Sequence, residues 1–257
     1  MKTIHLYINE KLKINKDTNK FTLFPKTVKE LKEMIKEEME KNGVHCSLNH
    51  IDISALNNLN ELFMYSDFDG DISGWDTSNI LQLSHTFAYS SFTGKYGDIS
   101  KWDVSSVKLM RGIFYGAHYN GDISDWDVSN VINFRDVFFN SKFDGDLSKW
   151  DVSSAENMQG MFNKSYFTGH KGDIANWDVS NVTDMTSMFK ENVYFNGDIT
   201  KWNVSNVTSM EGMFRGSSYV ANLSKWVLNS KCSTTNMFVD NPIGKDSRKV
   251  PQGFIRI

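Results

Sequence analysis

Cysteine, proline and long apolar runs are scarce in this sequence. Of its 257 residues only two are cysteines, Cys46 and Cys232, which are too few for a disulfide-dense secreted scaffold or a four-cysteine zinc site. The N-terminal residues lack the apolar run of about 7–15 residues that marks a signal peptide, and no stretch approaches the roughly 18 apolar residues of a membrane-spanning helix. We therefore expect a cytoplasmic protein without membrane contact.

A surplus of one charge sign is also missing. The formal net charge is -3, so the molecule lacks the strong positive field that attracts nucleic acid or anionic lipid. Direct nucleic-acid binding is therefore not expected. In contrast, 40% of the residues are hydrophobic and 13% are aromatic, which is ample for a packed core and excludes a disordered composition.

The aromatic residues reveal an internal repeat. Seven tryptophans recur at spacings of 24 to 27 residues, and a phenylalanine follows each of them by twelve residues. The tryptophans are Trp75, Trp102, Trp126, Trp150, Trp177, Trp202 and Trp226, and the phenylalanines are Phe87, Phe114, Phe138, Phe162, Phe189, Phe214 and Phe238. One period before Trp75 stands Ile51, with Phe63 twelve residues later, so an atypical copy begins the array. The sequence predicts eight coils of about 24 residues.

Further apolar columns predict the structure of each copy. We number positions from the tryptophan, or from Ile51 in the first copy. Isoleucine or leucine stands three residues before the tryptophan and mostly valine two after it, which predicts a short strand with tryptophan and valine on one face. Mostly methionines at positions 8 and 11, with phenylalanine at 12, predict a short α-helical or 3-10 segment. Because one copy cannot cover its own apolar edge, we expect an α/β solenoid over residues 48–240.

The two ends depart from the period. Residues 11–14 and 21–24 predict a hairpin, and Thr27 with Glu30 forms a capping box before an apolar helix face that ends near Gly43. Residues 1–47 are therefore expected to form a small α+β cap, and residues 241–257 an irregular closing segment. Two three-residue insertions, at residues 95–97 and 170–172, are expected to bulge on one edge.

Units of the repeat resemble a known family. The segments GDISKWDVSSV (residues 97–107) and GDIANWDVSNVTDMTSMF (residues 172–189) closely resemble the bacterial surface-protein repeat of the BspA-like, DUF285 group, and the resemblance spans about residues 48–240. That group is similar to the leucine-rich repeats, whose frame fits Ile99, Trp102 and Val104. The resemblance implies a right-handed, curved binding solenoid without catalytic residues. Valines such as Val107 replace the asparagine column of that superfamily.

Aspartate columns are the strongest candidates for chemistry. One column stands four residues before the tryptophan, as in Asp71, and one directly after it, as in Asp76. Stacked carboxylates could collect Ca²⁺, which takes six to eight oxygen ligands, but an aspartate beside a turn glycine commonly accepts backbone N–H bonds instead. We favour this turn-capping interpretation. The histidines lack a metal-ligand spacing and the glycines form no phosphate loop, so we expect no enzyme, metal or cofactor.

Positions that vary between copies are free to recognise a partner. Lysines precede several tryptophans, and aromatic or basic residues follow the phenylalanine column. The lysines also fit a solvated, charge-balanced sheet, and some rings also fit a role in shielding turns. The candidate partner-binding residues are Tyr89, Tyr115, His118, Phe139, Lys164, Tyr166, Tyr194, Arg215, Lys101, Lys149 and Lys201.

These features favour non-catalytic binding of a macromolecule, with another protein as first choice. One concrete hypothesis is a phage or mobile-element product that inhibits a host defence protein. The alternative is a cell-surface adhesin or carbohydrate-binding module that stacks sugars on Tyr89, Tyr115 and Tyr166.

Overall fold

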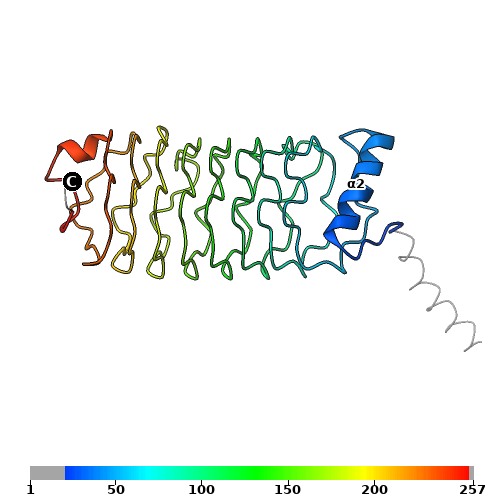
Figure 1. Cartoon of the computed structure of the whole chain (residues 1–257), viewed down its shortest axis with the longest axis horizontal. Coiled ribbons are helices and arrows are strands. Elements are labelled where there is room, and N and C mark those ends of the chain that lie inside the picture. The colour runs from blue at the N-terminus through cyan, green and yellow to red at the C-terminus, as the bar shows by residue number, and fades with distance from the viewer. Residues whose placement is uncertain (1–20, 255–257) are drawn as a thin grey trace, which may run out of the picture.

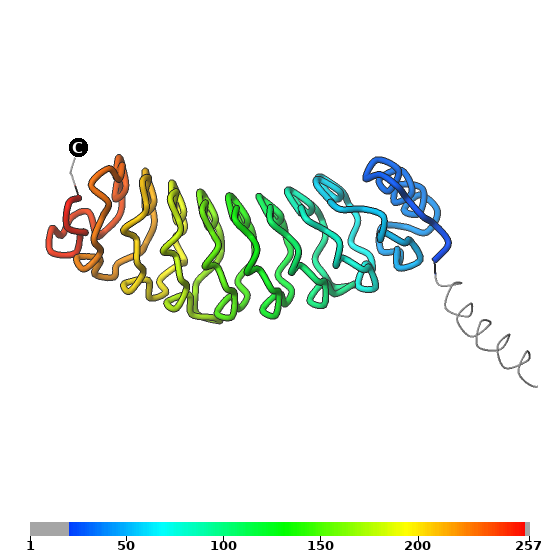
Figure 2. Tube along the Cα trace, turned by 90° about the horizontal axis from the view of Figure 1, so that it is seen from below, coloured from blue at the N-terminus to red at the C-terminus, as the bar shows by residue number. Residues whose placement is uncertain are grey.

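The computed structural model describes residues 21–254, which wind into coils stacked along one axis (Figure 1). Helix α2 (Val28–Asn42) closes one end of the stack, and the 3-10 helix η1 (Pro242–Lys245) lies at the other. Viewed from below, the stack is gently curved (Figure 2). We number the coils 1 to 8 from Ile51. The assignment of this stack to the α/β and leucine-rich classes stays a prediction.

Adjacent coils are joined by parallel backbone hydrogen bonds. Isolated parallel bridges link position 7 of each coil to position 7 of the next, from Asn58–Gln82 at the first junction to Ser209–Ser233 at the last. Beyond each bridge, the N–H groups at positions 8, 10, 12 and 14 donate to the carbonyls at positions 7, 9, 11 and 13 of the following coil, with N···O distances of 2.7–3.3 Å. We call positions 7–15 of each coil, counted from the tryptophan position, the turn ladder.

The N–H groups at positions 11, 13 and 15 of the turn ladder bond within their own coil. In coil 2, Thr86 donates to the carbonyl of Leu83 and Ala88 to that of His85, so β-turns follow one another. Positions 10 and 14 have left-handed backbone in every coil; in coil 2 they are His85 (φ 56°) and Tyr89 (φ 53°). The chain of turns therefore directs every second N–H group toward the next coil along the stack.

The predicted elements inside each coil were wrong. Among residues 21–254, the tryptophan segment forms no regular strand and positions 8–12 form no helix. The apolar spacing of three and four residues fits a chain of β-turns as well as a helix. A helix would use all of its interior N–H groups internally, whereas in coils 1 to 7 four of the nine N–H groups of the turn ladder bond to the next coil.

The core is built of aromatic columns. Phenylalanines at position 12 stack along the whole array with ring centroids 5.5–5.9 Å apart, and all seven tryptophans are buried. Each indole Nε1 also donates to the carbonyl three residues before the tryptophan position of the preceding coil, at 3.0–3.1 Å. A second buried column follows five or six residues after the first, and its members are Phe68, Phe92, Tyr119, Phe143, Phe167, Phe195 and Tyr219.

The N-terminal helix begins and ends as its sequence predicts. Thr27 caps α2 by accepting the N–H of Glu30 at 3.1 Å, and the N–H of Gly43 donates to the carbonyl of Met39 at 2.8 Å. In the second arm of the predicted hairpin, Leu23 pairs in parallel with Ile51 of coil 1, and the hairpin itself stays a prediction. The first arm, residues 11–14, lies outside the described residues.

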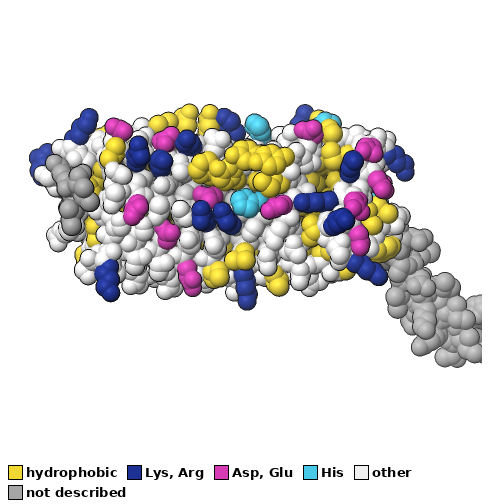
Figure 3. Space-filling view, in the orientation of Figure 1, with side chains coloured by type: hydrophobic (Ala, Val, Ile, Leu, Met, Phe, Trp, Pro, Cys, Tyr) yellow, Lys and Arg dark blue, Asp and Glu magenta, His cyan; other side chains and the backbone are white. Residues whose placement is uncertain are grey.

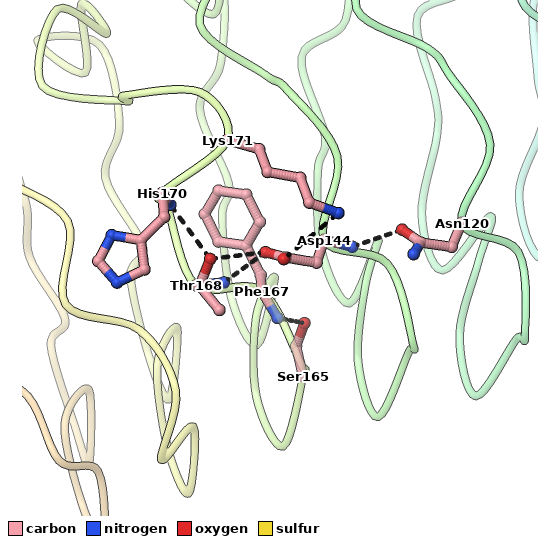
Figure 4. Close-up of polar contacts among 7 residues, drawn as sticks. All are labelled: Asn120, Asp144, Ser165, Phe167, Thr168, His170 and Lys171. Carbon is pink, nitrogen blue, oxygen red and sulfur yellow. Dashed lines mark hydrogen bonds and ion pairs between the residues drawn. The ribbon is translucent and has the colours of Figure 1, made fainter.

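The second insertion is anchored to the coil before it (Figure 4). Asp144 accepts hydrogen bonds from the N–H and hydroxyl of Thr168, both at 2.8 Å, and Lys171 reaches the same carboxylate at 3.7 Å. The side chain of Asn120 accepts the N–H of Asp144 in turn. Polar side chains therefore continue the coil-to-coil bonding at this edge.

Candidate functional site

Four aromatic side chains form a continuous row on the outside of coils 1 to 4. Ring centroids of Tyr65 and Tyr89 lie 5.1 Å apart, those of Tyr89 and Tyr115 5.1 Å apart, and those of Tyr115 and Phe139 4.4 Å apart. Tyr65 and Tyr89 are exposed, and the other two rings are half-buried. We call these four residues the aromatic ladder. On the face drawn in Figure 3, apolar side chains gather over the middle coils beside basic residues and a histidine.

The turn ladder fixes where these rings stand. Tyr65 and Tyr89 occupy position 14, whereas Tyr115 and Phe139 occupy position 13. In coil 3, position 14 is Gly116, which has a φ of 62°. A Cβ atom at Gly116 would lie 2.5 Å from the ring of Tyr89, so the glycine leaves room for that ring to lie against its neighbour. The backbone beneath the row is held by the inter-coil bonds, so the rings stand on a rigid support.

The aromatic ladder is electrically neutral. Burial, reinforced by a hydrogen bond with Tyr89, raises the pKa of the Tyr115 hydroxyl to about 12, so this group stays protonated at neutral pH. Burial, followed by the charge of Arg111, lowers the pKa of His85 below its ordinary value, which keeps this imidazole neutral as well. Arg135 pairs with Asp136 at 3.1 Å. The neighbouring charges are therefore mixed in sign.

A second, smaller aromatic cluster stands apart from the ladder. The rings of Tyr166 and Tyr194 stack 4.9 Å apart, and the ammonium of Lys142 lies 3.6 Å from the centroid of the Tyr166 ring. A hydrogen bond from Lys142, together with its charge, lowers the pKa of the Tyr166 hydroxyl. This cluster already contains its own cation.

The other predicted binding residues are dispersed. His118 is exposed, Lys164 pairs with Glu191 at 3.4 Å, and Arg215 lies beside a shallow groove in the last coils. The lysines before tryptophans are exposed as well, and one of them pairs with Asp125 at 2.8 Å; they are Lys101, Lys149 and Lys201. The structure therefore brings together Tyr89, Tyr115 and Phe139 in one group and Tyr166 and Tyr194 in another.

Sequence reasoning missed Tyr65 and Lys142. Tyr65 belongs to the copy without a tryptophan, but it stands fourteen residues after Ile51 as Tyr89 stands fourteen after Trp75. Extending the alignment of columns into coil 1 would have found it. Lys142 stands at position 16 of coil 4 and Tyr166 at position 16 of coil 5, so the same alignment would also have brought these two residues together.

The aspartate columns cap turns. Asp71 and Asp76 each accept the N–H and the hydroxyl of the serine two residues later, at 2.6–3.1 Å. Within residues 21–254, no group of three or more histidine, cysteine, aspartate or glutamate residues is placed to hold a metal ion. Over the same residues, no helix is long and apolar enough to cross a bilayer.

Comparison with known proteins gives one match. A family model described as "Mycoplasma protein of unknown function, DUF285" matches residues 6–96, 29–142, 88–170 and 142–247. No curated protein and no solved structure matches the chain.

Proposed function

We propose that this chain, which belongs to the DUF285 family, binds another protein without catalysis and holds it through the aromatic ladder. We also propose that its coils are of the BspA-like, leucine-rich kind. The observation that carries the function is the unbroken row of four outward rings on consecutive coils. Isolated exposed apolar residues are ordinary, whereas contiguous exposed apolar surface usually marks an interaction site.

The composition and rigidity of the row favour a protein partner. Tyrosine and phenylalanine are enriched where protein interfaces bury their central residues. Rings that are already held by their neighbours lose little conformational freedom when a partner covers them, so more of the contact energy remains as affinity. Occupying a surface of the partner would itself be the activity, as in the hypothesis of an inhibitor of a host defence protein.

The carbohydrate alternative fits the row less well. A sugar stacks on the open face of an aromatic ring, but the ladder rings cover one another's faces. Tyr89 and Tyr115 are inclined at 61°, so they offer no flat platform. The exposed rings of Tyr65 and Tyr89 and the half-buried rings beside them suit an irregular protein surface better.

The test is affinity purification with mass spectrometry, followed by measurement of the dissociation constant with the purified partner. We expect the triple variant Tyr89→Ser, Tyr115→Ser, Phe139→Ser to bind its partner at least about 100-fold more weakly, because large interface rings contribute roughly 2 kcal/mol or more each. The matched control is Tyr166→Ser with Tyr194→Ser, which removes the other ring pair and should keep the affinity.

Thermal unfolding of both variants separates lost contact from lost folding. The proposal fails if the triple variant is folded and binds the partner as tightly as the unaltered chain. It also fails if a glycan array gives strong binding while no protein is recovered.

A further inference from the structure

The first coil has a row of backbone carbonyls that lack the N–H donors of a preceding coil. At each of the seven junctions, the carbonyls at positions 7, 9, 11 and 13 accept N–H groups from the preceding coil. Coil 1 has no preceding coil, and no N–H group of the described residues donates to its equivalent carbonyls, which belong to Asn58, Asn60, Leu62 and Met64. An unpaired backbone edge of this kind is a ready template for another chain.

A groove of about 520 Å³ opens beside this edge. Helix α2 forms one wall with Ile35 and Met39, and coil 1 forms the other with Leu62 and Met64. Leu31 and Ile35 are buried and hold α2 against the core, and the groove lies between the helix and the turn ladder of coil 1. Its volume lies within the range of pockets that bury a small organic ligand, which is enough room for a few side chains.

The groove meets the aromatic ladder. Met64 and Ser66 line the groove, and Tyr65, the first ring of the ladder, stands between them in the chain. The rim carries both charge signs, with Lys32 and Lys36 on α2 opposite Glu61 on coil 1. Because the rim carries both charge signs, it does not favour a strongly charged ligand. The apolar walls favour apolar side chains.

We propose that this groove binds an extended segment of the partner protein, which pairs its N–H groups with the free carbonyls of coil 1 and places apolar side chains against α2. This inference rests on the proposed function, because it assigns the groove and the ladder to one partner. An extended strand directs every second N–H toward the same side, and the free carbonyls also recur at every second residue. Addition of a strand to an open edge is a recurring mode of peptide recognition.

The test uses linear peptides selected from a display library on the immobilised full chain. Their affinities are measured for the unaltered protein, for Met39→Glu with Met64→Glu, and for the matched control Met39→Leu with Met64→Leu. We expect the glutamate variant to bind at least about tenfold more weakly, because it places charge in an apolar groove, and the leucine control to bind normally. Both methionines are only partly buried, so the chain should remain folded.

N-methylation of the selected peptides tests the backbone pairing without altering the protein. Each N-methyl group removes one N–H donor, so we expect a loss of about tenfold at alternate residues and little change at the residues between them. The inference is overturned if the losses show no period of two, or if the glutamate variant binds the peptides normally.

Two other occupants would also overturn it. A synthetic peptide of residues 1–20 that displaces the selected peptides would assign the groove to the chain itself. Concentration-dependent self-association that is lost in Met39→Glu with Met64→Glu would assign it to a second copy. Failure of the proposed function is distinguishable, because then Tyr89→Ser, Tyr115→Ser, Phe139→Ser would leave partner binding unchanged while the peptide results still hold.

Discussion

At the scale of single residues, each tryptophan joins two coils in two ways. Its ring fills the core beside the phenylalanine column, as Trp75 does against Phe63, and its Nε1 donates a second hydrogen bond to a carbonyl of the preceding coil. A phenylalanine could supply the ring but not the hydrogen bond. This explains why the repeat keeps tryptophan at this position and tolerates its loss only in coil 1, which follows no other coil.

Replacing one central tryptophan should therefore lower stability measurably. We expect Trp150→Phe to reduce the free energy of unfolding by about 1–3 kcal/mol. The variant removes the indole hydrogen bond to the Ile123 carbonyl, which keeps only the bond from the N–H of Trp126, and it leaves a small void beside that carbonyl. Urea unfolding followed by circular dichroism provides the measurement. Lys149→Ala is the control: its ion pair with Asp125 is exposed to solvent, so we expect the free energy of unfolding to stay almost unchanged. Equal stability of both variants would refute the role of the indole bond.

At the scale of elements, the aspartate turns couple stability to pH. Hydrogen bonds from the hydroxyl and then the N–H of the residue two places later lower the pKa values of Asp76 and Asp198. A depressed folded-state pKa stabilises the protein above the unfolded value of about 3.9, and this stabilisation is lost as the pH falls through the folded-state value. Acid should therefore weaken these turns.

We expect Asp76→Asn with Asp198→Asn to flatten the decline of unfolding free energy below about pH 4, because asparagine keeps an acceptor oxygen and does not titrate. The chain contains its own precedent in Asn203, whose side chain accepts the N–H of Ser205 in the same kind of turn. The measurement is urea unfolding at several pH values between about 5 and 2. An unchanged pH profile in the variant would show that these turns do not set the acid sensitivity.

At the scale of the whole molecule, the stack should tolerate the loss of one complete coil. Deleting residues 133–156 joins Ile132 to Asn157 and keeps every column in register. We expect cooperative unfolding with a denaturant m-value smaller by roughly an eighth, because one of eight repeats no longer exposes its surface. Deleting only residues 133–144 shifts the columns by half a period and should prevent folding, as far-ultraviolet circular dichroism would show. Folding of both deletions would contradict the columnar core.

The sequence predicts this arrangement unevenly, for physical reasons. The residue types of Trp150 and Phe162 recur in the other copies because the same packing contact recurs in every coil. Both columns can therefore be recognised from the sequence alone. The second buried column escapes notice because it mixes Phe143 with Tyr119 and shifts by one residue at Phe195. The type of local structure was also missed, because apolar spacing does not show whether an N–H group bonds within its coil or to the next one.

The candidate site was only partly predictable. Tyr89, Tyr115 and Phe139 contact one another although they occupy two different positions in the repeat, and an alignment of columns does not show that rings from positions 13 and 14 meet. The groove beside α2 depends on how the helix packs on coil 1, which no local pattern specifies. Contacts between a cap and a repeat have no second copy in the sequence to compare with.

The one-way bonding of the turn ladder gives the molecule an electrical polarity. In each of coils 1 to 7, four peptide groups point their N–H toward the C-terminal end of the stack. Fewer backbone bonds point the other way, such as those in which Lys108 donates to Leu81 and Ser91 donates to Ser66. Aligned peptide dipoles add, as they do along an α-helix. The last coil, whose N–H groups of Thr234, Asn236, Phe238 and Asp240 donate to no described residue, is thus the positive pole, and the carbonyl row of coil 1 is the negative pole. Each added coil moves the two poles further apart, whereas the partial charge at each end is set by the unpaired peptide groups of the terminal coil.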